Sequence, residues 1–444
     1  MASVAIPYQN EVNKINSMGV KGGGFSYKAV LHLMTSNQNY TPLKVVNMDI
    51  IRDYDKQITD DIEIALAVTP GTWTDHVMPQ IDNLEITVYR YPTGNPGGKI
   101  TPTRYKAYCK DAIDYRKRNT HLQKATTEEL DRSDIVIHKF QLVPVLIEKL
   151  LTVQVGTIFN DCTVGDALSA FLVGESGVIP TLPDEEGLRG LDMVPPDNKT
   201  VYKTIPIPQG INLLSLPVYM QKQLYGIYNG GLNHYIQNGI WYVYPKFKMD
   251  IESGQSRYAN IYTIYRDTYR YAEKTFMVEG KDVSIIGTLE NEIKKSTAAN
   301  ALNHGNGLRI VNQKMIGTDA GWDVKGNKAR LTRSKNVSEW FLKEETHGVR
   351  NAKVIQERGI NPYEITGSLE ASHGNVYAIN WHNASPDRIA PGTIVKVHYI
   401  DSKETYKEIT GILMKAHYYI QSLSDMIAEE TYGCSGALFI YSKD

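Results

Sequence analysis

The sequence predicts an α+β protein that is mainly β, with two β-barrel domains joined by smaller α/β modules. Two observations lead to this fold class. Short strand patterns separated by turn residues fill both ends of the chain. Between them, residues 204–247 combine a short helical pattern, a glycine stop and two aromatic runs around Asn238-Gly239, which is a strong hairpin signal. The composition agrees, because 29 tyrosines against 8 phenylalanines suit half-buried sheet faces and wet interfaces.

Length and charge restrict the class of protein. The 444 residues allow roughly two to four domains of about 100–200 residues each. The net charge of −1 argues against a protein that works by neutralising many phosphates. Three cysteines, Cys109, Cys162 and Cys434, lie far apart in sequence and indicate folding in a reducing compartment without a disulfide framework. No secretion signal is visible, and no apolar run reaches the ~18–20 residues of a membrane span.

The N-terminal part predicts a flexible lead-in and a first barrel. Residues 1–25 are polar and end in three consecutive glycines, so we expect them to be flexible. Residues 26–139 are predicted to form the first barrel domain. Strand patterns cover 26–34, 43–53, 62–68, 84–91 and 99–109, with a short helix over 72–81. The charged residues 111–134 are expected to form a loop or excursion.

Residues 140–255 predict an α/β linker module. Thr163 with Asp166 three residues later forms a near capping box before a helix that ends at Gly174. Residues 174–200 have the composition of a loop. A second helix follows, and Gly226 comes where a left-handed cap belongs. The aromatic hairpin around Asn238-Gly239 completes the module.

Residues 256–444 predict a second barrel domain with a polar insertion. Strand patterns cover 260–265, 275–278, 282–287, 363–369, 376–381, 393–399, 411–422 and 429–441. The polar residues near 290–350 are expected to form helix or an excursion, and Ile389-Ala-Pro-Gly392 a turn that opens a strand. Whether the two β regions are copies of one domain is left open by the sequence.

No constellation in the sequence predicts a catalytic, metal-binding or cofactor-binding site. The eleven histidines form no HxxxH pair, and the glycines at 22–24 lack the Lys-Ser/Thr of a phosphate loop. The segment Gly433-Cys434-Ser435-Gly436 is similar to a nucleophile turn, but a strand follows where a hydrolase needs a helix, so a β-turn is predicted. Residues 262–271 interleave tyrosine with arginine and fit either base stacking or a strand with surface charges; the near-zero net charge favours the strand.

Two ordered motifs resemble a known architecture. The first is Phe140-x-Leu142-x-Pro144, then Ile158-Phe159-Asn160-Asp161-x-Thr163-Val164-x-x-Ala167-Leu168. The second is Gln223-Leu224-Tyr225-Gly226-Ile227-Tyr228, followed by a hairpin ending Trp241-Tyr242-Val243-Tyr244. They resemble the strand–turn–helix and helix–strand elements of tail and baseplate hub proteins of contractile-tailed bacteriophages, a superfamily that includes the hub part of type VI secretion spikes. Ile389-x-Pro391-Gly392-x-x-Val395-x-Val397 resembles the turn that opens a late barrel strand in those hubs.

The resemblance covers 140–250 and, more loosely, the last sixty residues. It departs from secretion-system hubs at Val153–Thr157, where those hubs have an arginine-serine-arginine lead-in, and the insertion near 290–350 has no counterpart. The residues that match the structural motifs are Phe159, Asp161, Thr163, Leu168, Leu224, Tyr225, Gly226, Tyr228, Trp241, Tyr244, Pro391 and Gly392.

The resemblance implies a structural virion protein without enzymatic activity or cofactor. Its two tube-like barrels imply a homotrimer whose six similar domains form a pseudo-sixfold ring, a symmetry adaptor. The implied partners are the tail tube protein and the central spike protein, with the tape measure and baseplate wedge proteins as further contacts. DNA would only pass through the lumen. The implied location is the tail baseplate of the virion, after synthesis in the host cytoplasm.

Two alternatives remain at this stage. One is a tail protein that binds or degrades cell-wall carbohydrate, suggested by the tyrosine bias, acidic loops and three tryptophans expected to be exposed: Trp73, Trp322 and Trp340. The other is a baseplate adaptor that contacts sheath or wedge.

Overall fold

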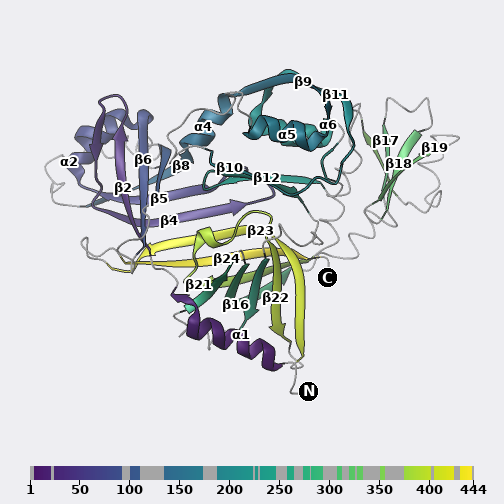
Figure 1. The fold of residues 1–444 in the computed structure, drawn as a ribbon. Helices are drawn as coiled ribbons and strands as arrows, with labels where there is room; N and C mark the ends of the chain where they lie inside the picture. The colour runs from purple at the N-terminus through teal and green to yellow at the C-terminus, as the bar shows by residue number, and fades with distance from the viewer. Residues whose placement is uncertain are drawn as a thin grey trace.

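The computed structural model confirms the α+β, mainly β fold class (Figure 1). It describes residues 5–21, 25–92, 101–110, 135–173, 188–223, 226–228, 231–246, 258–264, 274–280, 282–293, 308–312, 320–325, 328–333, 351–355, 375–401, 405–424 and 431–442. The predicted strand over 363–369, the loop over 111–134 and the arginines of 262–271 lie outside these residues. No helix in the described part of the chain is long and apolar enough to cross a membrane.

Six strands close the C-terminal barrel, which is the lower body in Figure 1. The strands are, in spatial order, β14 (Tyr258–Thr263), β22 (Ile394–Ile400), β23 (Tyr406–Ser422), β24 (Tyr432–Ser442), β21 (Asn375–His382) and β16 (Asp282–Ile293). A parallel ladder between β16 and β14 closes the ring. Alternation along β24 buries Tyr432, Cys434, Leu438 and Ile440 on one face, as expected for a strand with one side on a core. β15 (Lys274–Glu279) pairs with the first part of β16.

In the described part of the chain, the N-terminal barrel has six strands and an open seam. They are, in spatial order, β4 (Lys44–Asp53), β5 (Asp61–Val68), β8 (Val136–Pro144), β7 (Thr101–Cys109), β6 (Leu84–Pro92) and β2 (Phe25–Leu33), with β3 (Gln38–Tyr40) beside β2. A helical segment of α2 (Pro70–Thr72), η1 (Trp73–Val77) and η2 (Met78–Asn83) links β5 to β6. β2 and β4 form no ladder with each other. The buried Tyr432 hydroxyl from the other barrel spans this seam, within 3.3 Å of the Tyr27 carbonyl and 3.0 Å of the Val45 carbonyl.

Five strands have the same order in both barrels. The order β4-β5-β8-β7-β6 corresponds to β16-β21-β24-β23-β22, and every neighbouring pair in both sets is antiparallel. The first barrel strands differ, because β2 is antiparallel to β6 whereas β14 is parallel to β22. A β4–β23 ladder, from Asn47 opposite Gln421 to Asp53 opposite Lys415, carries one sheet from barrel to barrel.

The α/β module packs around its own apolar core, at the top of Figure 1. Its elements are α4 (Val145–Thr152), a ribbon of β9 (Gln154–Cys162) with β11 (Tyr202–Asn212), α5 (Val164–Val173), β10 (Gly190–Met193), η3 (Leu213–Ser215), α6 (Leu216–Gln223) and the hairpin β12 (Leu232–Gln237) and β13 (Ile240–Pro245). β8 crosses the predicted boundary at 139/140, because its residues up to Pro144 still pair within the first barrel.

Three expectations were wrong in whole or in part. Residues 5–21 are not a flexible lead-in: α1 (Ala5–Met18) buries Tyr8, Val12 and Ile15 against the second barrel, and β1 (Val20–Lys21) pairs with β15. Within the polar insertion, β17 (Leu308–Asn312), β18 (Ala320–Lys325) and β19 (Lys328–Arg333) form a sheet with β20 (Asn351–Ile355) that is separate from the barrels, so the helix alternative was wrong and the excursion alternative fits. Cys434 lies inside β24 and not in a β-turn. The glycines beside it serve packing and not a turn, because Gly433 leaves room for Leu423 and Gly436 leaves room for Ala384 and Tyr418.

Candidate functional site at the barrel junction

The first sequence motif forms a capped helix on the β9–β11 ribbon. The Asp166 N–H donates to the Thr163 hydroxyl at 3.1 Å, and the Thr163 N–H donates to the Asp166 carboxylate at 3.4 Å, so the predicted capping box is present. Asp161 takes a left-handed conformation with φ of 51° at the end of β9. Phe159 packs edge-on against Phe171 at 5.1 Å, and Leu168 is fully buried.

The second motif forms the end of α6 and a buried clamp. Gly226 has φ of 75°, and its N–H donates to the Met220 carbonyl at 3.3 Å, which confirms the left-handed cap. The fully buried Gln221 amide accepts the Ile227 and Tyr228 N–H groups at 2.7 and 3.0 Å and donates to the Tyr228 carbonyl at 2.7 Å. Leu224 and Tyr225 lie outside the described residues.

The aromatic residues of this motif divide between two surroundings. Tyr228 and Trp241 lie in the module core with Leu168, and the Tyr228 hydroxyl donates to the Val194 carbonyl. Tyr244 instead faces the second barrel, where it meets the Pro391-Gly392 turn. A Cβ on Gly392 would lie 2.8 Å from the Tyr244 ring, and Gly392 has φ of 71°. Glycine is therefore required here for both backbone conformation and space.

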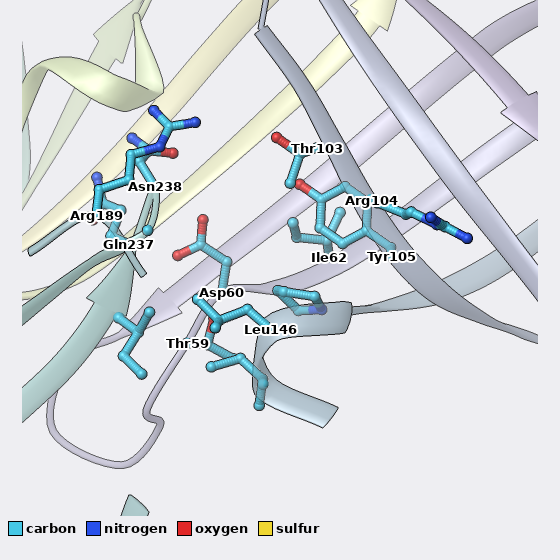
Figure 2. Close-up of a pocket in the computed structure, with 14 residues that line it drawn as sticks. Thr59, Asp60, Ile62, Thr103, Arg104, Tyr105, Leu146, Arg189, Gln237 and Asn238 are labelled. Carbon is cyan, nitrogen blue, oxygen red and sulfur yellow. The ribbon is translucent and has the colours of Figure 1, made fainter. Parts of the chain in front are cut away.

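The tip of the hairpin borders a small pocket against the first barrel (Figure 2). Asn238 and Gly239 have φ of 53° and 75°, as a two-residue type I′ turn requires. The cavity measures about 90 Å³ and lies between this tip and β7, with the Asp60 carboxylate directed into it. Small-molecule sites usually measure about 300–1,000 Å³, so this pocket is too small for a sugar chain.

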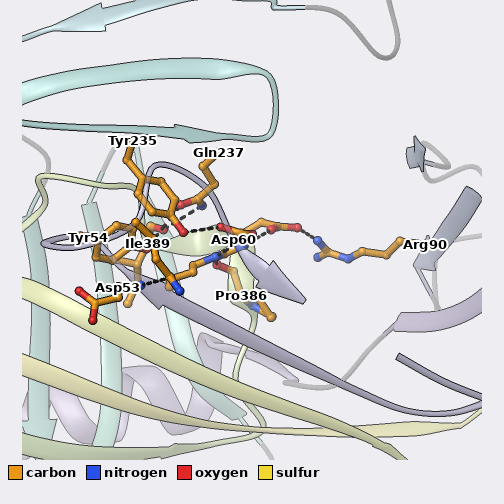
Figure 3. Close-up of polar contacts among 11 residues, drawn as sticks. Asp53, Tyr54, Asp60, Arg90, Tyr235, Gln237, Pro386 and Ile389 are labelled. Atoms are coloured by element: carbon orange, nitrogen blue, oxygen red, sulfur yellow. Dashed lines mark hydrogen bonds and ion pairs between the residues drawn. The ribbon is translucent and has the colours of Figure 1, made fainter. Parts of the chain in front are cut away.

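A buried arginine, Arg52, lies where the two barrels and the hairpin meet. Figure 3 labels several of its neighbours, among them Asp60 and Pro386. Arg52 on β4 is 2% exposed, and its Nε and Nη2 donate to the Asp60 carboxylate at 3.1 and 2.9 Å. Its Nη1 donates to the Pro386 carbonyl, and its Nη2 lies 3.4 Å from the Asp387 carboxylate, both on η6 (Pro386–Arg388) of the second barrel. One side chain therefore links strand β4 to the turn that precedes β22.

The hairpin adds its own hydrogen bonds to this junction. The Tyr235 hydroxyl donates to Asp60 at 2.9 Å, and the Gln237 amide donates to the Ile389 carbonyl at 3.3 Å. Tyr54 approaches the Gln237 amide oxygen at 3.4 Å. Arg90 from β6 forms an ion pair with Asp387. We call Arg52, Asp60, Tyr235, Gln237 and Asp387 the junction network.

Electrostatics keep the arginine at the centre of this network charged. Burial is the largest single effect and opposes the charge of Arg52, but Asp60, Tyr54 and Tyr418 together outweigh burial and raise the pKa of the guanidinium. Burial, with Asp60 beside it, also raises the pKa of Tyr235, so its hydroxyl keeps its proton. Groups that are bonded to one another in this way hold the surrounding structure in place.

Cys434 is buried and Trp73 is partly buried. Burial raises the pKa of the Cys434 thiol to about 12, so the thiol stays neutral and is a poor nucleophile. Trp73, expected to be exposed, is half-buried and stacks on His138 at 3.5 Å between ring centroids, so it is not a free sugar platform. In the described part of the chain, no group of three or more His, Cys, Asp or Glu residues is placed to hold a metal ion.

The junction network was missed by the sequence reasoning. One signal was present: alternation along β4 places Met48 and Ile50 on the inner face, and Arg52 follows at the same spacing. A charged residue at an inward position indicates a buried ion pair. Nothing in the sequence indicated Asp387 as a partner, 335 residues away.

Comparisons with known proteins give distant matches of fold. No protein-family model matches the sequence, and a search of curated proteins found no match.

A tail protein from Neisseria meningitidis MC58 aligns with a TM-score of 0.45 and 11% identity, over 94% of this chain and 96% of that chain. The 43 kDa tail protein of prophage MuSo2 from Shewanella oneidensis aligns with a TM-score of 0.45 and 11% identity, over 93% and 97%. A type VI secretion system component from E. coli aligns with a TM-score of 0.39 and 7% identity, over 90% and 74%. Phage tail and type VI secretion proteins are thus among the structures similar to this one, and the similarity is too distant to assign a function.

Proposed function

We propose that this chain is a structural, non-enzymatic hub subunit of a phage tail baseplate. Three copies form a ring that joins the sixfold tail tube to the threefold central spike. The tape measure and baseplate wedge proteins are further contacts, and DNA passes through the lumen only in transit. The protein is made in the host cytoplasm and resides in the virion.

One observation carries this proposal: two barrels in one chain repeat the same order of five strands and share a continuous sheet. Two similar domains in each of three subunits give six similar positions around a threefold axis, which is what a threefold-to-sixfold adaptor needs. The junction network supports the proposal, because buried ion pairs and hydrogen bonds restrict the angle between the barrels. The ordered motifs at 140–250 and at Pro391-Gly392 agree with it.

Light scattering coupled to size-exclusion chromatography tests the proposal. We expect a mass of three times the 49.9 kDa chain, alone or with spike protein added. Images of the particle should then show three subunits with pseudo-sixfold symmetry. A stable monomer in the presence of spike protein would contradict the proposal. Turnover of peptidoglycan by the pure protein would contradict its non-enzymatic character.

A further inference from the structure

The ladder between the two barrels is formed by strands that extend beyond their neighbours. β22 pairs with β23 only as far as Ile412. β23 continues, and the Tyr54 N–H donates to the Met414 carbonyl at 3.0 Å, where the ladder with β4 begins. The contact between the barrels therefore needs two strands. One, β23, extends past its neighbour β22, and the other, β4, has a side that no strand of its own barrel occupies.

β7 occupies the same position in the first barrel as β23 does in the second. β6 pairs with β7 as far as Lys106, while β8 pairs on to Cys109, and the Lys110 N–H donates to the Lys139 carbonyl at 2.9 Å. β7 thus extends past β6 in the way that β23 extends past β22. Tyr108 in this extension is 51% exposed.

β16 occupies the position in the second barrel that β4 has in the first. β4 in its ladder with β5, and β16 in its ladder with β21, each contain one extra residue after the second pair of the ladder. In β4 it falls between Val45 and Asn47, and in β16 between Leu289 and Asn291. β14 pairs with one side of β16 only up to Gly287. Among the described residues, no strand pairs with that side over 288–293.

We infer that this side of β16 binds β7 of a second copy of the chain, in an antiparallel ladder equivalent to β4–β23. The inference rests on the proposed trimeric hub and names the strands that form its subunit contacts. The occupant is a second copy because the chain already contains both halves of such a contact, one on each barrel. A strand edge with unpaired N–H and C=O groups binds an extended strand readily. Such contacts are head-to-tail and form a ring when the rotation closes.

Hydrogen exchange measured by mass spectrometry tests this contact in the full chain. The protein is compared at a concentration where it is oligomeric and after dilution to monomer. We expect at least tenfold slower exchange in the oligomer for 107–110 and 288–293. The exposed β9 ribbon, 154–162, should not change.

A proline substitution provides a second test. Asn291→Pro places a proline in the part of β16 that the proposed ladder uses and restricts the strand there, so subunit association should weaken at least tenfold. Asn160→Pro, at an exposed position of β9, is the matched control and should leave association unchanged. Circular dichroism shows whether Asn291→Pro folds. If it does not fold, the exchange measurement on the natural chain decides whether β7 and β16 form the contact.

The outcomes separate this inference from the proposed function. A natural chain that stays monomeric with spike protein overturns both. A trimer that shows no protection at 107–110 and 288–293 overturns the strand assignment and leaves the trimeric hub standing. Protection at both segments, with association lost in Asn291→Pro and kept in Asn160→Pro, supports the assignment.

Discussion

Replacing Arg52 by methionine tests how much the junction network stabilises the fold. Methionine keeps an apolar stem of similar length but removes the hydrogen bonds to Asp60 and the contacts with Pro386 and Asp387. The Asp60 side chain, 14% exposed, then keeps the Tyr235 hydroxyl as its bonded neighbour. Breaking a buried ion pair by removing one partner costs about 3–5 kcal/mol, so we expect the free energy of unfolding to fall by about that amount.

Urea denaturation followed by tyrosine and tryptophan fluorescence measures this change. Adding Asp60→Asn to Arg52→Met removes the stranded charge and should restore about 1–3 kcal/mol, because the two residues are directly coupled. Lys396→Met is the matched control. It removes a 3.7 Å ion pair with Glu408 in which both side chains are 39% exposed, and such exposed pairs contribute less than about 1 kcal/mol. Equal losses in Arg52→Met and Lys396→Met would refute the reasoning.

Three further predictions concern the turn, the cap and pH. Gly392→Ala should lower the free energy of unfolding by about 2–4 kcal/mol, because φ is 71° and the Cβ would meet Tyr244 at 2.8 Å. Gly280→Ala, with φ of 64° and open space, should lose only the backbone part of about 1–2 kcal/mol. Thr163→Ala should lose about 0.5–2 kcal/mol and Thr163→Ser much less, since serine keeps the cap. Burial lowers the pKa of His234 to about 4, below its ordinary value of 6.5, so the unfolded chain binds the proton first and stability falls as pH falls through this window. Between about pH 7.5 and pH 5 the natural chain should lose about 2 kcal/mol that His234→Gln does not lose.

Each of these predictions has a measurement that can contradict it. Urea titrations of the two glycine variants should differ, and identical values would show that Tyr244 yields to a Cβ without cost. A serine variant at position 163 as unstable as the alanine variant would show that the hydroxyl does not act as the cap. For His234, parallel stability curves of natural and variant chains from about pH 7.5 to 5 would show that the imidazole is not held neutral by burial.

Local features of this protein were predictable from short segments. The capping box at Thr163, the left-handed Gly226 and the Asn238-Gly239 turn depend on hydrogen bonds and backbone angles within a few residues, so the residue types suffice to indicate them. The helix over 5–18 was missed for a different reason. Its apolar residues are few, and only packing on the second barrel makes it stable.

The sequence by itself determined the mainly β class, the capped helix and the hairpin, because each results from interactions between near neighbours in the chain. Only the tertiary structure decided that the two β regions share a strand order, and that Tyr432 of one barrel spans the open seam of the other. Only the tertiary structure, too, placed Arg52 beside Asp387, since ladders and buried ion pairs join residues far apart in sequence. Which of these long-range pairings forms depends on the total burial and hydrogen bonding of the folded chain, and no short segment contains that information.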